Sequence, residues 1–292
     1  MSVYGTSPIK RTRRTKAEIE ALDVALVEIV EQFRPVTVRQ VFYQAVNRSL
    51  VPKHETKGYR VVQRRLVTLR ESGEIPYDYI VDGTRYVHGH QRYNDLDEFT
   101  TYAAGLYRKD YWANSEVNVE VWLEKDALKG VLSPTVVNEC GLNLYVTRGF
   151  ASITYLQEAA EEIEDDGRPT YVYVLTDFDP SGVSIAEKVE EELTERAPFA
   201  EIKVERLAVN REQIERWNLP TRPTKASDTR ASKFRRIHGT DSVELDAIPP
   251  DELRQLVKNA IDSHMEAWQL QQFRMVEREE KQTLRSMFRE AS

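Results

Sequence analysis

The chain has 292 residues, of which 40% are hydrophobic and 30% are charged, and these proportions fit about two globular domains with a real core. No segment approaches the run of about 20 apolar residues that spans a bilayer, and no apolar signal core follows Met1. The single cysteine, Cys140, excludes an internal disulfide and a multi-cysteine zinc site. We therefore expect a cytoplasmic protein with no membrane partner.

The charge is distributed unevenly along the chain. Residues 1–73 contain fourteen Lys and Arg against seven Asp and Glu, so this segment carries +7. Because the whole chain carries −7, the remainder carries −14. This asymmetry favours a front end that faces nucleic acid, attached to an acidic body.

The N-terminal part predicts three helices followed by a β-hairpin. Residues 1–15 are polar and basic and are expected to form a flexible arm. An Asp-Gly step between β-prone runs at 77–88 is typical of a hairpin. Three helices and a hairpin are the order of a winged helix, which we predict for residues 16–95; the alternative is a small helical domain with a solvated basic helix. Apolar spacing places the helices at 16–33, 38–50 and 55–73.

The third of these helices carries a concentration of positive charge. In a winged helix the third helix usually meets DNA, which makes its cations candidate DNA-binding residues. They are Lys57, Arg60, Arg64 and Arg65. The helix also carries Arg70 near its end, which is not among these candidates.

Beyond a Tyr- and Asp-rich connector at 96–116, strands and helices alternate through residues 117–220, which predicts a mostly parallel sheet covered by helices. The basic stretch 221–236 shows no periodicity and is expected to be a loop within the last segment, 221–292. The expected strands are 117–124, 142–147, 170–176 and 202–209. The expected helices are 126–138, 152–165, 180–196 and 210–217, with 250–263 and 265–288 closing the chain.

Three carboxylates fall at the carboxyl ends of expected strands, where open α/β sheets place their functional crevice. They are Glu124, Asp177 and Asp179. Oxygen donors without His or Cys suit Mg²⁺ rather than zinc, and such an ion can neutralise a phosphodiester. Two alternatives remain open: Asp179 before Pro180 is also an ordinary helix N-cap, and Glu124 could be a solvated strand end.

Other chemistries find little support in the sequence. The glycine-rich loops that bind nucleotide phosphates are missing, which argues against nucleotide hydrolysis by this chain. His88 and His90 flank Gly89 in the expected hairpin, where histidines are more often surface residues than metal ligands.

The second expected helix offers a nucleophile. Tyr43 lies about 130° from the centre of the apolar stripe, and Arg39 lies one turn earlier on the same polar side. A phenol can attack phosphorus to form a phosphotyrosine, and a guanidinium can stabilise the developing charge. The alternative is an exposed tyrosine without a chemical role.

In combination, these motifs resemble the A subunit of type IIB topoisomerases (topoisomerase VI) and its relatives, the meiotic double-strand-break transesterase and the Mini-A proteins. The similar segments, in family order, are V-R-Q-V-F-Y-Q at 38–44, V-E-V-W-L-E-K-D-A-L at 119–128, V-T-R-G-F-A-S at 146–152, D-F-D-P-S-G at 177–182 and V-E-L-D-A-I at 243–248. The resemblance covers most of residues 35–265. Ala151 replaces the family's usual proline, and the chain is shorter than a full topoisomerase A subunit.

The resemblance implies a combined α/β and α+β fold, with a winged helix followed by a Toprim-like domain. It implies that Tyr43 is the nucleophile, with Arg39 beside it, and that Glu124, Asp177 and Asp179 bind Mg²⁺, Glu124 also serving in proton transfer. Arg148 falls in a matching segment and is expected to contact DNA. The implied partners are double-stranded DNA, a second copy of the chain and a separate ATPase (B-type) subunit, in a nucleoid-associated setting.

The expected activity is DNA cleavage through a covalent 5′-phosphotyrosyl intermediate. Two alternatives stay open. One is a Toprim nuclease that uses metal-activated water, in which Tyr43 is only structural. The other is a non-catalytic DNA-binding protein whose acids hold no metal.

Overall fold

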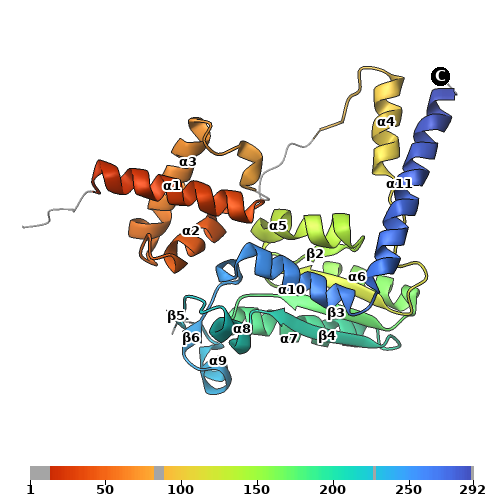
Figure 1. The fold of residues 1–292 in the computed structure, drawn as a ribbon. Coiled ribbons are helices and arrows are strands. Elements are labelled where there is room, and N and C mark those ends of the chain that lie inside the picture. Colours follow the sequence, from red (N-terminus) through yellow and green to blue (C-terminus); the bar gives the residue numbers. More distant parts are fainter. Residues whose placement is uncertain (1–13, 82–88, 226–227, 291–292) are drawn as a thin grey trace, which may run out of the picture.

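The computed structural model describes residues 14–81, 89–225 and 228–290. At its centre is a four-stranded, entirely parallel sheet with the strand order β2-β1-β3-β4 (Figure 1). The strands are β1 (Asn118–Leu123), β2 (Leu144–Val146), β3 (Thr170–Leu175) and β4 (Ile202–Ala208). The fold is therefore of the mixed α/β class that the alternation of elements predicted.

Helices cover both faces of this sheet. Side chains alternate between the faces along a strand, so Val121 and Leu123 of β1 pack on one side and Trp122 on the other. Helices α6 (Ile153–Asp166) and α7 (Pro180–Arg196) pack on the Trp122 side. On the opposite side lie α5 (Lys129–Ser133) and α10 (Pro250–Asp262).

Three N-terminal helices lie beside the sheet domain, at the left of Figure 1. Thr15 and Thr37 both cap helices in reciprocal capping boxes, with Glu18 and Gln40 respectively. The buried side chains of these helices and of the α5/α10 face of the sheet form one continuous hydrophobic cluster. The elements are α1 (Lys16–Phe33), α2 (Val38–Asn47), the π-helical turn η1 (Glu55–Tyr59) and α3 (Arg60–Glu71).

The predicted hairpin at 77–88 lies largely outside the described residues. Before it, Tyr77–Tyr79 forms a 3₁₀ turn, and Ile80 pairs with Val36 in an isolated parallel bridge. His88, which was expected in this hairpin, also falls outside the described part. No helix among the described residues combines the length and apolar character needed to cross a bilayer.

The expected connector at 96–116 includes a helix that was not predicted. It contains α4 (Leu96–Leu106), capped by Asp95 and packed along α11 (Ala267–Glu290), as Figure 1 shows. Glu280 of α11 accepts hydrogen bonds from Tyr107 and Lys109. Contacts with a helix more than 160 residues away stabilise this segment, and its own sequence does not reveal them.

The prediction of an irregular loop at 221–236 also needs correction. Strands β5 (Arg222–Pro223) and β6 (Asp241–Ser242) pair antiparallel, and the chain between them contains α9 (Ala231–His238). Phe234 of α9 packs edge-on against Phe178, with ring centroids 5.3 Å apart. One buried aromatic residue anchors α9, which is too weak a signal for periodicity to detect.

Smaller differences concern two predicted helices. Residues 126–138 are divided into η3 (Asp126–Leu128), α5 and the π-helical η4 (Pro134–Glu139). The helix expected at 210–217 is α8 (Arg211–Arg216), and η5 (Leu245–Ala247) forms a 3₁₀ turn ahead of α10.

Candidate functional site

Two of the predicted acids meet at the carboxyl edge of the sheet. Strands β1 and β3 are hydrogen-bonded neighbours, so the residues that follow them emerge side by side. The backbone N–H of Asp177 donates to Glu124 Oε2 at 3.2 Å, and Asp177 is 8% exposed. The structure thus brings Glu124 and Asp177 together.

Asp179 has a structural task in addition. Its Oδ1 accepts the N–H of Gly182 at 2.8 Å, and Pro180 occupies the first turn, so Asp179 is the N-cap of α7. A Cβ at Gly182 would lie 2.1 Å from the carbonyl oxygen of Asp177, which keeps this turn tight. Asp179 Oδ2 lies 3.8 Å from Arg222.

A lysine that the sequence reasoning missed lies among the acids. Lys125 Nζ is 2.8 Å from Asp177 Oδ1, 2.6 Å from Asp246 Oδ2 and 3.8 Å from Glu244 Oε2. Asp246 and Glu244 come from the segment 243–248, whose acids were quoted for the resemblance but given no role. The sequence patterns that could have pointed to these residues were Glu-Lys at 124–125 and Glu-x-Asp at 244–246.

Burial and charge shift the pKa values of these groups. Burial raises the pKa of Glu124 to about 7, and the nearby Asp177 carboxylate acts in the same direction. Burial also raises the pKa of Asp177, although the Lys125 ammonium opposes this change. Burial works to lower the pKa of Lys125, but Asp246 and Asp177 outweigh it and hold the amine in its charged form.

The acids fit magnesium by the chemistry of their donor atoms. Glu124, Asp177 and Asp179 offer only carboxylate oxygens, the ligands that Mg²⁺ prefers. A raised pKa in two adjacent buried carboxyls indicates a place where a further positive charge would be favourable. Within the described ranges, no three His, Cys, Asp or Glu side chains form a group that could hold a metal ion as they stand.

Tyr43 is not on an exposed helix face, and this prediction was wrong. Tyr43 is 3% exposed, and α2 packs against η5 (Leu245–Ala247) of the sheet domain. Burial raises the pKa of the phenol, Glu244 raises it further, and Arg39 opposes both effects. The Phe42 ring lies 5.2 Å away, so the phenol is bordered by both apolar and charged groups.

Arg39 also reaches across to the sheet domain. Its Nε and Nη2 donate to the two carboxylate oxygens of Glu244 at 3.1 and 3.3 Å. Arg222 Nη1 donates to Glu244 Oε1 at 2.8 Å. Burial acts to raise the pKa of Glu244, but Lys125, Arg39 and Arg222 outweigh it and keep this carboxyl ionised.

Lys53 fastens the same region from the N-terminal side. Its Nζ donates to the carbonyls of Pro220 and Thr221 at 2.6 and 2.9 Å and lies 5.5 Å from the centre of the Tyr43 ring. Burial lowers the pKa of Lys53 to about 8. Neither Lys53 nor Arg222 was singled out from the sequence, because basic residues in aperiodic segments give no sign of what they contact.

A cleft of about 720 Å³ opens beside this cluster, between the N-terminal helices and the sheet edge. Arg39, Tyr59 and Arg70 line it on one side, and Lys125 and Asp246 on the other. Both basic and acidic groups of the cluster are therefore accessible from one cavity.

The predicted DNA-binding residues differ in exposure and in whether an acidic side chain binds them. Lys57, Arg60 and Arg64 are exposed on η1 and α3. Arg65 instead forms a two-pronged ion pair with Asp23 of α1, at 2.7 and 2.6 Å, and so joins two helices. Arg148 is two-thirds exposed and lies 3.0 Å from Asp126.

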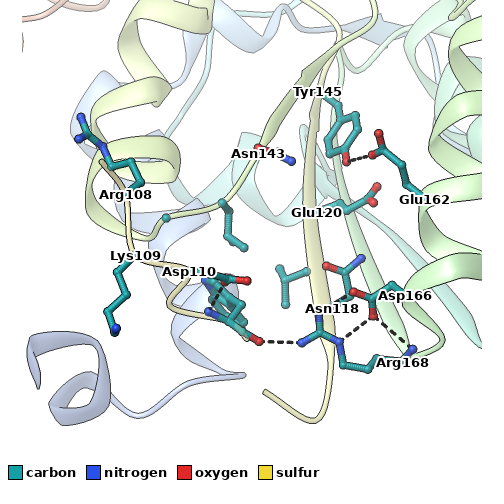
Figure 2. Close-up of a pocket in the computed structure, with 14 residues that line it drawn as sticks. Arg108, Lys109, Asp110, Asn118, Glu120, Asn143, Tyr145, Glu162, Asp166 and Arg168 are labelled. Carbon is teal, nitrogen blue, oxygen red and sulfur yellow. Dashed lines mark hydrogen bonds and ion pairs between the residues drawn. The ribbon is translucent and has the colours of Figure 1, made fainter. Parts of the chain in front are cut away.

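A second cavity, of about 410 Å³, lies at the opposite end of the strands (Figure 2). Asn118 begins β1 there, and Arg168 is held by Asp166 and by the carbonyl of Trp112. Glu120 points into this region, and burial raises its pKa to about 7, although Trp122 Nε1 donates to it at 2.7 Å. None of the predicted site residues lines this cavity.

No protein-family model and no curated protein matches this sequence.

Proposed function

We propose that this chain cleaves double-stranded DNA by magnesium-dependent tyrosine transesterification, in the manner of the topoisomerase VI A subunits that it resembles. In this proposal residues 16–95 are a winged-helix domain and residues 117–220 a Toprim-like domain. The observation that carries it is the contact between α2 and the sheet edge: Arg39 lies 3.1 Å from Glu244, whose neighbour Lys125 lies 2.8 Å from Asp177. Arg39 of α2 and the acids at the sheet edge therefore belong to one connected cluster of charged groups.

In the proposed reaction, the phenol oxygen of Tyr43 attacks phosphorus and forms a new P–O bond. The enzyme is then attached to the 5′ end of the cleaved strand. The bond from phosphorus to the 3′ oxygen breaks, and that oxygen leaves as a hydroxyl after taking up a proton. Arg39 binds the phosphate and offsets its developing charge. Glu124, a carboxylate beside Asp177 at the sheet edge, accepts the phenol proton. A magnesium ion held by Glu124, Asp177 and Asp179 would supply neutralisation of the phosphodiester.

Burial of Tyr43 sets a condition on this reaction. A phosphodiester can reach the phenol only when the contact between α2 and the 243–248 segment opens. We propose that opening accompanies assembly of a homodimer, in which Tyr43 of one subunit faces the acids of the other. An ATPase subunit and a location at the nucleoid remain further parts of the same proposal.

The decisive experiment is a search for the covalent adduct. Supercoiled DNA is incubated with protein and Mg²⁺, denatured, digested with nuclease and analysed for phosphotyrosine. We expect the adduct on Tyr43, its loss in Tyr43→Phe and Asp177→Asn, and its persistence in the control Tyr102→Phe, which alters a tyrosine of α4. Undiminished cleavage by Tyr43→Phe would exclude the tyrosine mechanism.

The burial of Tyr43 favours one alternative, a nuclease in which a metal-bound water attacks the phosphate. This alternative gives cleavage without an adduct, retained in Tyr43→Phe and lost in Asp177→Asn. The pairing of Lys125 with Asp177 favours another, a DNA-binding protein without catalysis. In that case DNA binding falls steeply with salt, and neither cleavage nor Mg²⁺ binding is detected by calorimetry.

A further inference from the structure

Glu244 is the meeting point of two arginines from distant parts of the chain. Arg39 comes from α2 and binds both carboxylate oxygens, while Arg222 comes from β5 and binds one of them at 2.8 Å. The Glu244 side chain is only 6% exposed, whereas those of Arg39 and Arg222 are 38% and 32% exposed. The arginines are thus open to solvent on one side while the carboxylate between them is covered.

The two guanidinium groups also suit a phosphate. A guanidinium presents its N–H groups in a planar fork that binds carboxylate and phosphate oxygens in the same two-pronged way. A phosphodiester carries one negative charge, as Glu244 does, so the two guanidinium groups can bind it in place of the carboxylate. Arg39 also lines the 720 Å³ cleft, which gives such a ligand a route to the site.

Arg222 is held in position by its backbone. Strand β5 pairs with β6 so that Arg222 lies opposite Ser242, two residues before Glu244. Lys53 binds the carbonyls of Pro220 and Thr221 just ahead of it. A guanidinium on a fixed backbone binds an anion with less loss of conformational entropy than one on a free loop.

We propose that Arg222 and Arg39 together form a binding site for a DNA phosphodiester, and that Glu244 occupies this site as an internal substitute while DNA is absent. Arrival of the phosphate displaces Glu244 from both arginines. Before displacement Glu244 lies 3.8 Å from Lys125, a third cation toward which it can move. Displacement also releases the contact that covers Tyr43. The inference rests on the proposed function for the identity of the ligand, but it concerns binding and needs no cleavage.

The test measures DNA binding alone. A short fluorescent duplex is titrated with protein in EDTA by anisotropy at several salt concentrations, in a Tyr43→Phe background. We expect Arg222→Gln to bind about tenfold more weakly, with a salt slope lower by about one. Arg285→Gln removes the same charge from an exposed position of α11 and should leave the affinity and the salt slope unchanged. Glu244→Gln removes the competing anion and should bind about tenfold more tightly.

The outcomes separate the two proposals. If the Tyr43→Phe protein does not bind the duplex in EDTA, this inference fails, while the proposed function is decided by the adduct assay with Mg²⁺. If it binds and Arg222→Gln behaves like Arg285→Gln, the phosphate site is refuted while the proposed function stands. Weaker binding by a folded Glu244→Gln would refute the substitute role of Glu244.

A second variant makes the result independent of whether Glu244→Gln folds. Arg222→Lys keeps the positive charge and loses the planar fork. We expect it to retain the salt slope of the parent protein and to bind with an affinity between those of the parent and Arg222→Gln. An affinity equal to the parent's would overturn the forked recognition that we assign to Arg222.

Discussion

Lys125 Nζ lies 2.6 Å from Asp246 Oδ2, although the two residues are 121 positions apart in the sequence. The same ammonium contacts Asp177, so a single buried cation joins the end of β3 to the 243–248 segment. Removing one partner from a buried ionic cluster leaves charge without compensation, which costs about 3–5 kcal/mol.

The first prediction concerns this lysine. Lys125→Gln should lower the free energy of unfolding by about 3–5 kcal/mol in EDTA, while Lys129→Gln, on an exposed position nearby, should change it little. A cation that binds only the folded protein raises its stability. Millimolar Mg²⁺ should stabilise Lys125→Gln more than wild type, because in the variant no ammonium competes with the ion for Asp177. Urea unfolding with and without Mg²⁺ measures both effects. Equal stabilisation of the two proteins would contradict the magnesium assignment.

The second prediction separates the two tasks of Asp179. Asparagine caps a helix as well as aspartate does, so Asp179→Asn should keep the stability of wild type within a few tenths of a kcal/mol, whereas Asp179→Ala should lose about 1 kcal/mol. Both variants remove the carboxylate, and both should abolish DNA cleavage. Thermal unfolding and the plasmid assay provide the comparison. Full cleavage by Asp179→Asn would show that Asp179 is a cap and nothing more.

The third prediction is a pH dependence at Glu120. Its pKa is about 7 in the folded protein and near 4.5 when unfolded, so the folded state retains a proton that the unfolded chain releases. Stability should therefore fall as pH rises from about 4.5 through 7. Glu120→Gln removes this loss and should be more stable than wild type at pH 8 by up to about 3 kcal/mol, with no such gain at pH 4.

A control for this experiment is Glu164→Gln, at an exposed position of α6, which should show no such pH-dependent gain in stability. Urea unfolding across the pH range measures the difference. A gain for Glu120→Gln of equal size at pH 4 and pH 8 would contradict the titration of this buried carboxyl.

The fourth prediction compares adjacent arginines of α3. Arg65 is bound to Asp23 and largely covered, so Arg65→Gln should cost about 1–2 kcal/mol of stability. Arg64 is exposed, and Arg64→Gln should leave stability unchanged while weakening duplex binding and reducing its salt slope by about one. Anisotropy and urea unfolding report the two properties. The opposite pattern would place the DNA surface on the other side of α3.

Elements with local signals could be predicted from the sequence. The capping box at Thr15 and the Arg34-Pro35 step mark the ends of the first helix, and Asp179-Pro180 marks the start of α7. The regular alternation of strands and helices gave the parallel sheet. It also placed Glu124 and Asp177 at a common edge, because parallel neighbouring strands end together.

The remainder of the site depends on contacts that no local pattern contains. Arg39 and Glu244 are separated by 205 residues. Glu244 also lies near the buried phenol of Tyr43. Treating α2 as an isolated helix left its polar side in water, whereas in the structure acids of the sheet domain cover it. Lys125 and Arg222 were overlooked for the same reason: their chemistry depends on the carboxylates they face.

The last helix fixes the segment by which the chain enters the sheet. Glu277 binds the backbone N–H of Lys109 and the hydroxyl of Tyr111, and Glu280 binds Tyr107. The polypeptide that leads from the N-terminal helices into β1 is therefore tethered at 107–111. Any separation of α2 from the sheet must therefore occur ahead of residues 107–111. The distance that Tyr43 can move away from the sheet is limited by contacts with the opposite end of the chain.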